Sequence, residues 1–126
     1  MAIEWTVSHE DRLVTAVANH ATRRRDYPTF LAELSANGLV PYRKIFDLRY
    51  ARLEFTAADL RAWGQRVVDW GNADRPGPTA LLVDSDLARE LADMFTTHAR
   101  ANRPVGIFTS TEAARAWLDE VAPVKT

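Results

Sequence analysis

The sequence predicts a single α/β domain over residues 1–126, built from a mixed five-stranded β-sheet and four α-helices in the order β-β-α-β-α-β-α-β-α. Three observations predict this class. The first segments alternate apolar with polar residues, later segments alternate short apolar runs with amphipathic helical patterns, and Gly, Pro or Asn residues separate them. Strands that alternate with helices pair in parallel through right-handed crossovers, so the opening pair adds an antiparallel edge.

A β-hairpin is predicted at the start of the chain. Residues 3–8 alternate apolar with polar side chains, which indicates a strand with one buried face. Residues 13–19 repeat this alternation, and the polar turn between the two segments, 9–11, is short enough for a hairpin.

The first helix and the third strand follow. Asp26 is predicted to cap the helix, Pro28 lies in its first turn, and Gly38 ends it because glycine adopts the left-handed conformation at low cost. Residues 44–48, with the sequence KIFDL, are then predicted to form a short, mostly buried strand.

The second helix is predicted to begin at Thr56, because Thr56 and Asp59 have the spacing of a capping box. Apolar residues recur along it at spacings of three and four, which places them on one helical face: Leu60, Trp63, Val67 and Trp70.

The last two strands are short apolar runs, at 79–83 and 105–108, and a continuous apolar run is typical of a parallel strand that is covered on both faces. Ser85 or Asp86 is predicted to cap the helix between them, and Ser110 or Thr111 the final helix. Each helix has an apolar face, formed in the first by Leu87, Leu91, Met94, Phe95 and His98, and in the final one by Ala114, Trp117, Leu118 and Val121.

The composition excludes several classes of protein. The formal charge is −1, with 16 basic and 17 acidic residues, so nothing in the overall charge favours nucleic acid as a partner. The absence of cysteine excludes disulfides and thiolate metal sites. No apolar run approaches the roughly 20 residues that span a membrane, and the first residues do not have the pattern of a signal peptide. We therefore expect a cytoplasmic protein.

Sequence motifs for catalysis and cofactor binding are missing as well. The chain has no nucleophile elbow, no phosphate-binding glycine loop and no dinucleotide fingerprint, and His9, His20 and His98 are not at the spacing of metal ligands. We expect no cofactor and no metal. The run of arginines at 23–25 precedes a helix whose dipole opposes cations, which favours a solvated loop over a binding site.

Three segments carry a resemblance to a known family. The sequences KIFDLR at 44–49 and FTAADL at 55–60 resemble the strand, loop and helix start of STAS domains, and FTSTEAARAWL at 108–118 is similar to the end of the SpoIIAA-like proteins. The order of elements matches that family over nearly the whole chain. The resemblance implies a small non-enzymatic domain, since STAS relatives act as anti-sigma-factor antagonists or as cytoplasmic parts of anion transporters, and some SpoIIAA-like members are thought to bind apolar or nucleotide-like ligands.

The antagonists of that family carry a phosphorylated serine at the start of the helix after the third strand. The matching position in this chain is Ala58, which cannot accept phosphate. Thr56 is the one candidate phosphoacceptor left in that turn.

Ligands of open α/β sheets bind beyond the carboxyl ends of the parallel strands, where helix N-termini also attract anions. This rule selects a ligand-binding or partner-binding surface, and its candidate residues are Arg49, Tyr50, Arg52, Thr56, Asp84, Ser85 and Ser110. The simpler interpretation is that the hydroxyl residues among them only cap helices.

Two alternative functions remain open at this point. The protein could carry a small apolar ligand or a nucleotide in a pocket near Trp63 or Trp70, because aromatic side chains also line pockets. It could instead be an enzyme with Asp47 and Asp84 as an acid–base pair, which requires the two carboxyl groups to lie close together. A homodimer is also expected, because small domains with apolar helix faces often pair by two-fold symmetry.

Overall fold

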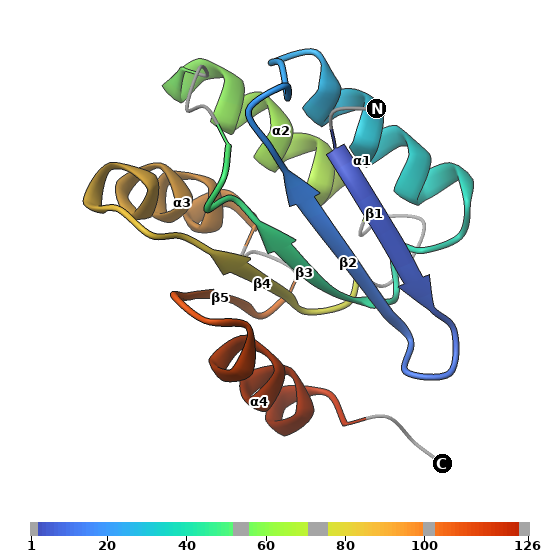
Figure 1. Cartoon of the computed structure of the whole chain (residues 1–126). Helices are drawn as coiled ribbons and strands as arrows, with labels where there is room; N and C mark the ends of the chain where they lie inside the picture. Colours follow the sequence, from blue (N-terminus) through green and yellow to red (C-terminus); the bar gives the residue numbers. More distant parts are fainter. Residues whose placement is uncertain (1–2, 52–55, 71–75, 100–102, 124–126) are drawn as a thin grey trace.

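The computed structural model shows a five-stranded sheet whose strands follow one another in chain order (Figure 1). It describes residues 3–51, 56–70, 76–99 and 103–123, and for 67–70, 87, 91, 94–96, 98 and 99 it describes the backbone alone. The strands are β1 (Ile3–Ser8), β2 (Leu13–Ala18), β3 (Arg43–Asp47), β4 (Thr79–Leu82) and β5 (Val105–Phe108). Strand β1 pairs antiparallel with β2, and all later pairs are parallel. The predicted hairpin and mixed sheet are confirmed.

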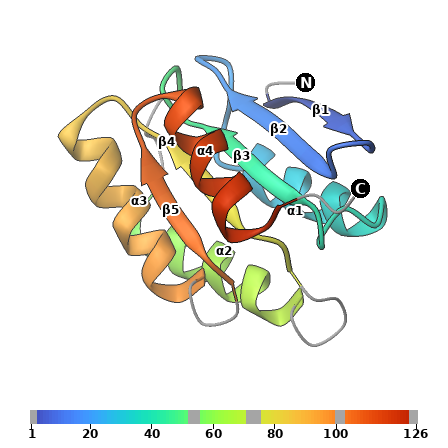
Figure 2. The same ribbon diagram turned by 90° about the horizontal axis from the view of Figure 1, so that it is seen from below.

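Four helices complete the fold: α1 (Asp26–Ala36), α2 (Ala57–Trp70), α3 (Asp86–Ala99) and α4 (Thr111–Val121). The element order is the one predicted from the sequence. Helices α1, α2 and α3 all cover the same face of the sheet, because successive right-handed crossovers that move in one direction place every helix on one side. Helix α4 follows the last strand and covers the opposite face (Figure 2).

The two faces of the sheet bury separate sets of apolar side chains, because successive residues of a strand point to opposite faces. On the face of α1 and α2, strands β1 and β2 pack against an aromatic cluster in which Phe30 contacts both Trp5 and Phe46. On the face of α4, the buried residues are Leu13, Ile45, Ala80, Leu82, Ala114 and Leu118. This second core is small, and α4 supplies two of its six residues.

Two details of the predicted helices are wrong. Asp26 does not cap α1: Arg25 is the N-cap residue and makes no capping bond, while a carboxylate oxygen of Asp26 accepts the backbone N–H of Arg23 at 2.7 Å. Asp26 thus stabilises the turn before α1 instead of capping the helix. Val121 does not lie on the inner face of α4, because its side chain is 41% exposed at the end of the helix, beyond the small core beneath it.

Buried cations lie at the amino edge of the parallel strands. Lys44 is 6% exposed, and its Nζ donates to the carbonyl oxygens of Val40 at 2.5 Å and Tyr42 at 2.7 Å. Arg103, two residues before β5, is 5% exposed; burial lowers the pKa of Lys44, and the charge of Arg103 lowers it further. Burial is the larger cause and brings that pKa to about 7, so the Lys44 amine is near its midpoint of ionisation at neutral pH.

Within the described part of the chain, no helix combines the length and the apolar character that crossing a membrane requires.

Candidate functional site

The carboxyl edge of the parallel strands holds the residues that the sequence selected, but the structure divides them between the two faces of the sheet. Phe46 packs in the core beneath α1, so the next residue, Asp47, points to the face of α4. Asp47, Arg49 and Asp84 form one group on that side. Thr56 starts α2 on the other side, where the arginine run also lies.

Asp47 and Arg49 form a closed ion pair at the end of β3. The Asp47 side chain is 8% exposed, and its two oxygens accept Arg49 Nε at 3.0 Å and Nη2 at 2.9 Å; the first also accepts the backbone N–H of Arg49. The Asp47 hydrogen bond raises the pKa of Arg49 above its ordinary value, and the charge of Asp84 adds a smaller contribution. Because two of its guanidinium nitrogens, Nε and Nη2, are bound to Asp47, Arg49 is engaged within the chain.

This ion pair makes a testable contribution to stability. Arg49→Ala leaves the buried Asp47 carboxylate with a single backbone N–H, so we expect the free energy of unfolding to fall by roughly 2–4 kcal/mol in a urea titration. Arg115→Ala, which removes an exposed arginine from α4, is the matched control and should change stability by less than about 0.5 kcal/mol. Equal stability of the two variants would show that the Asp47–Arg49 pair is dispensable.

The remaining polar candidates at this edge are helix caps. Ser85 Oγ accepts the N–H of Ala88 at the start of α3, and Ser110 Oγ accepts the N–H of Ala113 at the start of α4. Each satisfies a helix N–H that has no partner within the helix. Tyr50 is the exception: its ring is 52% exposed and lies over the Arg49 guanidinium at 5.5 Å.

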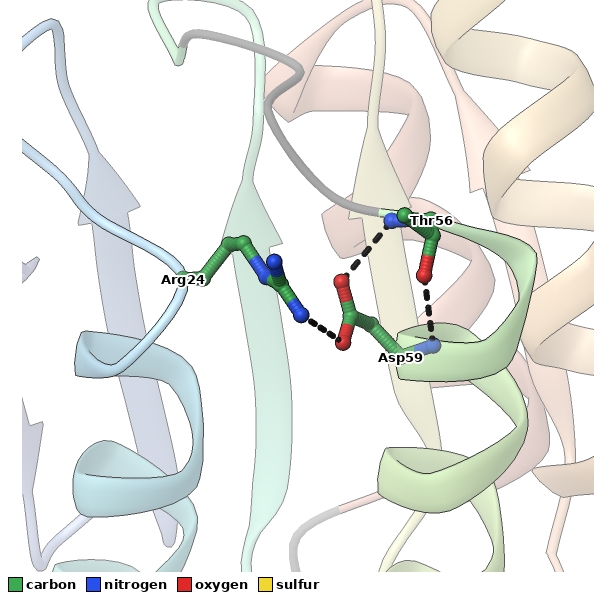
Figure 3. Close-up of polar contacts among 3 residues, drawn as sticks. All are labelled: Arg24, Thr56 and Asp59. Carbon is green, nitrogen blue, oxygen red and sulfur yellow. Dashed lines mark hydrogen bonds and ion pairs between the residues drawn. The ribbon is translucent and has the colours of Figure 1, made fainter.

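Thr56 and Asp59 form the predicted capping box at the start of α2 (Figure 3). Thr56 Oγ1 accepts the N–H of Asp59 at 3.1 Å, and Asp59 Oδ2 accepts the N–H of Thr56 at 2.8 Å. The second Asp59 oxygen accepts Arg24 Nη2 at 2.8 Å. These contacts lower the pKa of Asp59, the backbone N–H of Thr56 most strongly. Arg24 reaches Asp59 from the loop between β2 and α1, so this ion pair bridges two elements across the end of β3.

An open hollow of about 600 Å³ surrounds this bridge, and we call it the arginine hollow. It is lined by Arg23, Arg24, Arg25, Pro28, Asp59 and Trp63. Trp63 is only 9% exposed and stacks on Tyr27 with the ring centroids 4.9 Å apart. The hollow therefore combines one mostly buried aromatic side chain with three exposed arginines.

The arginine run and Trp63 are separate features in the sequence. The expected exposure of the run is confirmed, since residues 23–25 are all exposed, but Arg24 is also bound to Asp59. Arg23, Arg24 and Arg25 were not among the candidate site residues. Their link to Trp63 depends on the packing of α1 beside α2, which no short sequence pattern encodes.

Several other predictions meet the structure only in part. Ala58 is exposed in the first turn of α2, and Thr56, the candidate phosphoacceptor, is exposed beside it; whether it takes phosphate stays a prediction. Outside the described residues lie Arg52 and the side chains of Val67, Trp70, Leu87, Leu91, Met94, Phe95 and His98. In the described part of the chain, no group of three His, Asp or Glu side chains is placed to hold a metal ion.

No protein-family model, no curated protein and no solved structure matches this chain. The function must therefore be inferred from the contacts and charges of its own residues.

Proposed function

We propose that this protein is a cytoplasmic, non-catalytic interaction module with a STAS-like fold, and that it binds an acidic segment of a partner protein in the arginine hollow. The observation that carries the proposal is the presence of Arg23, Arg24 and Arg25 around the edge of Trp63 in one hollow. Arginine and tryptophan are the side chains most enriched among residues that dominate binding energy at protein interfaces.

Charge complementarity supports an acidic partner. The chain as a whole has a formal charge of −1, whereas the hollow has three arginines and one aspartate. A partner segment in the hollow is attracted by this local positive patch and is little affected by the net charge of the protein. The reason is that exposed charges separated by more than about 10 Å are screened at ordinary salt concentrations.

The shape of the hollow favours a protein segment over a small-molecule ligand. Ligand pockets usually enclose most of the ligand surface and are lined mainly by apolar side chains. The arginine hollow is open to solvent, and four of its six lining residues are charged. The alternative of a small-ligand carrier near Trp63 is therefore the weaker proposal.

The contacts of Asp47 favour a binding role over acid–base catalysis with Asp84. Both Asp47 oxygens are hydrogen-bonded to Arg49, so the carboxylate is already engaged within the chain. Asp84 is exposed beyond the end of β4. The pairing of two copies into a homodimer stays a prediction.

The test uses a fluorescein-labelled, glutamate-rich decapeptide with one leucine, titrated with the protein and followed by fluorescence anisotropy. Arg23→Glu/Arg25→Glu is expected to weaken binding about tenfold or more at low salt, because it replaces attraction by repulsion on the rim. The control is Arg89→Glu/Arg115→Glu, which makes the same change in net charge at exposed positions on α3 and α4.

Equal weakening by both double variants would show that the peptide senses only net charge and would contradict the proposal. A single-stranded oligonucleotide is added as competitor. If it displaces the peptide and binds more tightly than the peptide does, the arginine hollow is a nucleic-acid site and the acidic-partner proposal is wrong.

A further inference from the structure

We infer that Asp59 acts as a built-in competitor for the partner, so that the Arg24–Asp59 ion pair keeps the arginine hollow partly blocked until an acidic segment displaces it. This inference rests on the proposed function of the hollow. It adds a regulatory contact that the sequence did not indicate.

The Asp59 carboxylate lies in the lining of the hollow and binds Arg24, one of the three arginines that would receive a partner's carboxylate. An incoming acidic side chain therefore meets both a negative charge and an arginine that is already engaged.

The two partners of the ion pair differ in their freedom to move. Asp59 is held by the capping box, through the Thr56 N–H on its carboxylate and the Thr56 hydroxyl on its own N–H, and its side chain is 15% exposed. The Arg24 side chain is 60% exposed and extends from a loop. Binding of a partner thus requires Arg24 to turn away from Asp59, while Asp59 stays on its helix.

The exchange of one carboxylate for another is favoured by the geometry of the internal pair. Arg24 donates to Asp59 through Nη2 alone, and exposed ion pairs of this kind are weak. A carboxylate of a partner that accepts two hydrogen bonds from the guanidinium can therefore compete with Asp59. The internal pair therefore sets a threshold on affinity and admits segments with several acidic residues in preference to a single carboxylate.

Asp59→Asn separates the two roles of this residue. The asparagine side-chain oxygen still accepts the Thr56 N–H, so the cap of α2 is retained, but the negative charge is lost. We expect the affinity for the glutamate-rich decapeptide to rise about three- to tenfold at low salt. In the Arg24→Ala background the same change should raise affinity less than about twofold, because no arginine is there to be released.

Glu120→Gln is the matched control, since it removes one exposed negative charge on α4, on the opposite face of the sheet, and should leave the affinity unchanged. If the wild-type protein binds the decapeptide and Asp59→Asn binds it equally well or more weakly, Asp59 positions Arg24 instead of competing, and the inference is wrong while the proposed function stands. If Asp59→Asn alone binds, the competitor role is supported. If neither binds, both proposals fail.

Discussion

Replacing Gly77 with alanine is expected to lower the free energy of unfolding by about 3 kcal/mol or more, the largest effect we expect of any single methyl group in this chain. A Cβ at this position would fall inside the contact distance of the Tyr42 carbonyl oxygen and 2.5 Å from that of Pro41. These are backbone atoms, so no side-chain rotation relieves the overlap. The Gly77 N–H also donates to the Val40 carbonyl at 2.9 Å, which keeps the two loops in contact.

The measurement is a urea or thermal unfolding curve, in which the midpoint temperature should fall by about 10 °C or more. Gly38→Ala is the control, because the two glycines are required for different reasons. Gly38 has a φ of +69°, but a Cβ at this position would meet no atom within 4 Å, so alanine there is expected to cost only about 1 kcal/mol. A loss at Gly77 no greater than the loss at Gly38 would contradict this account.

The second large effect is an increase in stability as the pH rises from about 7 to about 9.5. The pKa of Lys44 is lowered from 10.5 to about 7 in the folded protein, first by burial and then by Arg103. In this pH range the unfolded chain holds a proton on Lys44 that the folded protein has released, and stability rises with pH wherever the unfolded state binds more protons. The full gain across the range is of the order of 3–4 kcal/mol.

Outside this pH range the stabilising effect of Lys44 deprotonation is absent or is opposed by another group. Below about pH 7, Lys44 is protonated in both states and the penalty of its buried charge is fully present. Above pH 10 the trend is opposed by Tyr27, whose pKa is raised to about 12 by burial and by Asp26, so that ionisation of the unfolded tyrosine lowers stability. The neutral lysine amine still donates to Val40 and Tyr42, so its deprotonation does not break these two hydrogen bonds.

Lys44→Met is the diagnostic variant, because methionine has a similar length and does not titrate. Its unfolding free energy should be nearly independent of pH between 7 and 9.5, whatever its absolute value. A wild-type curve that is flat or falls over this range would show that Lys44 keeps its charge in the folded protein.

The element order and the mixed sheet were predictable because each strand and helix of this chain has its own local pattern. The alternation at 3–8, the apolar runs at 79–83 and 105–108, and the capping spacing of Thr56 and Asp59 each depend on neighbouring residues only. The predicted capping role of Asp26 was wrong. An aspartate at the start of a helix can accept a hydrogen bond from an N–H of the preceding turn instead of one from the helix.

The candidate site was less predictable because its parts come from different elements. Arg24 and Asp59 are 35 residues apart, and only the packing of α1 beside α2 brings them together. The strand at 44–48 was predicted to be mostly buried, but the burial of its two charged residues, Lys44 and Asp47, was not, since charged residues normally indicate exposure. Each is buried here because a partner close in the chain satisfies it: the carbonyls of 40 and 42 for Lys44, and Arg49 for Asp47.

The order in which the strands are laid down has a consequence for synthesis on the ribosome. Each new strand joins the free edge left by the one before it, so the sheet can grow as the chain emerges, without reopening any earlier pairing. The second face of the sheet, however, stays bare until α4 is made. A nascent chain stalled before residue 111 would expose Leu13, Ile45 and Leu82 to solvent. Chaperones would be expected to bind this exposed apolar surface.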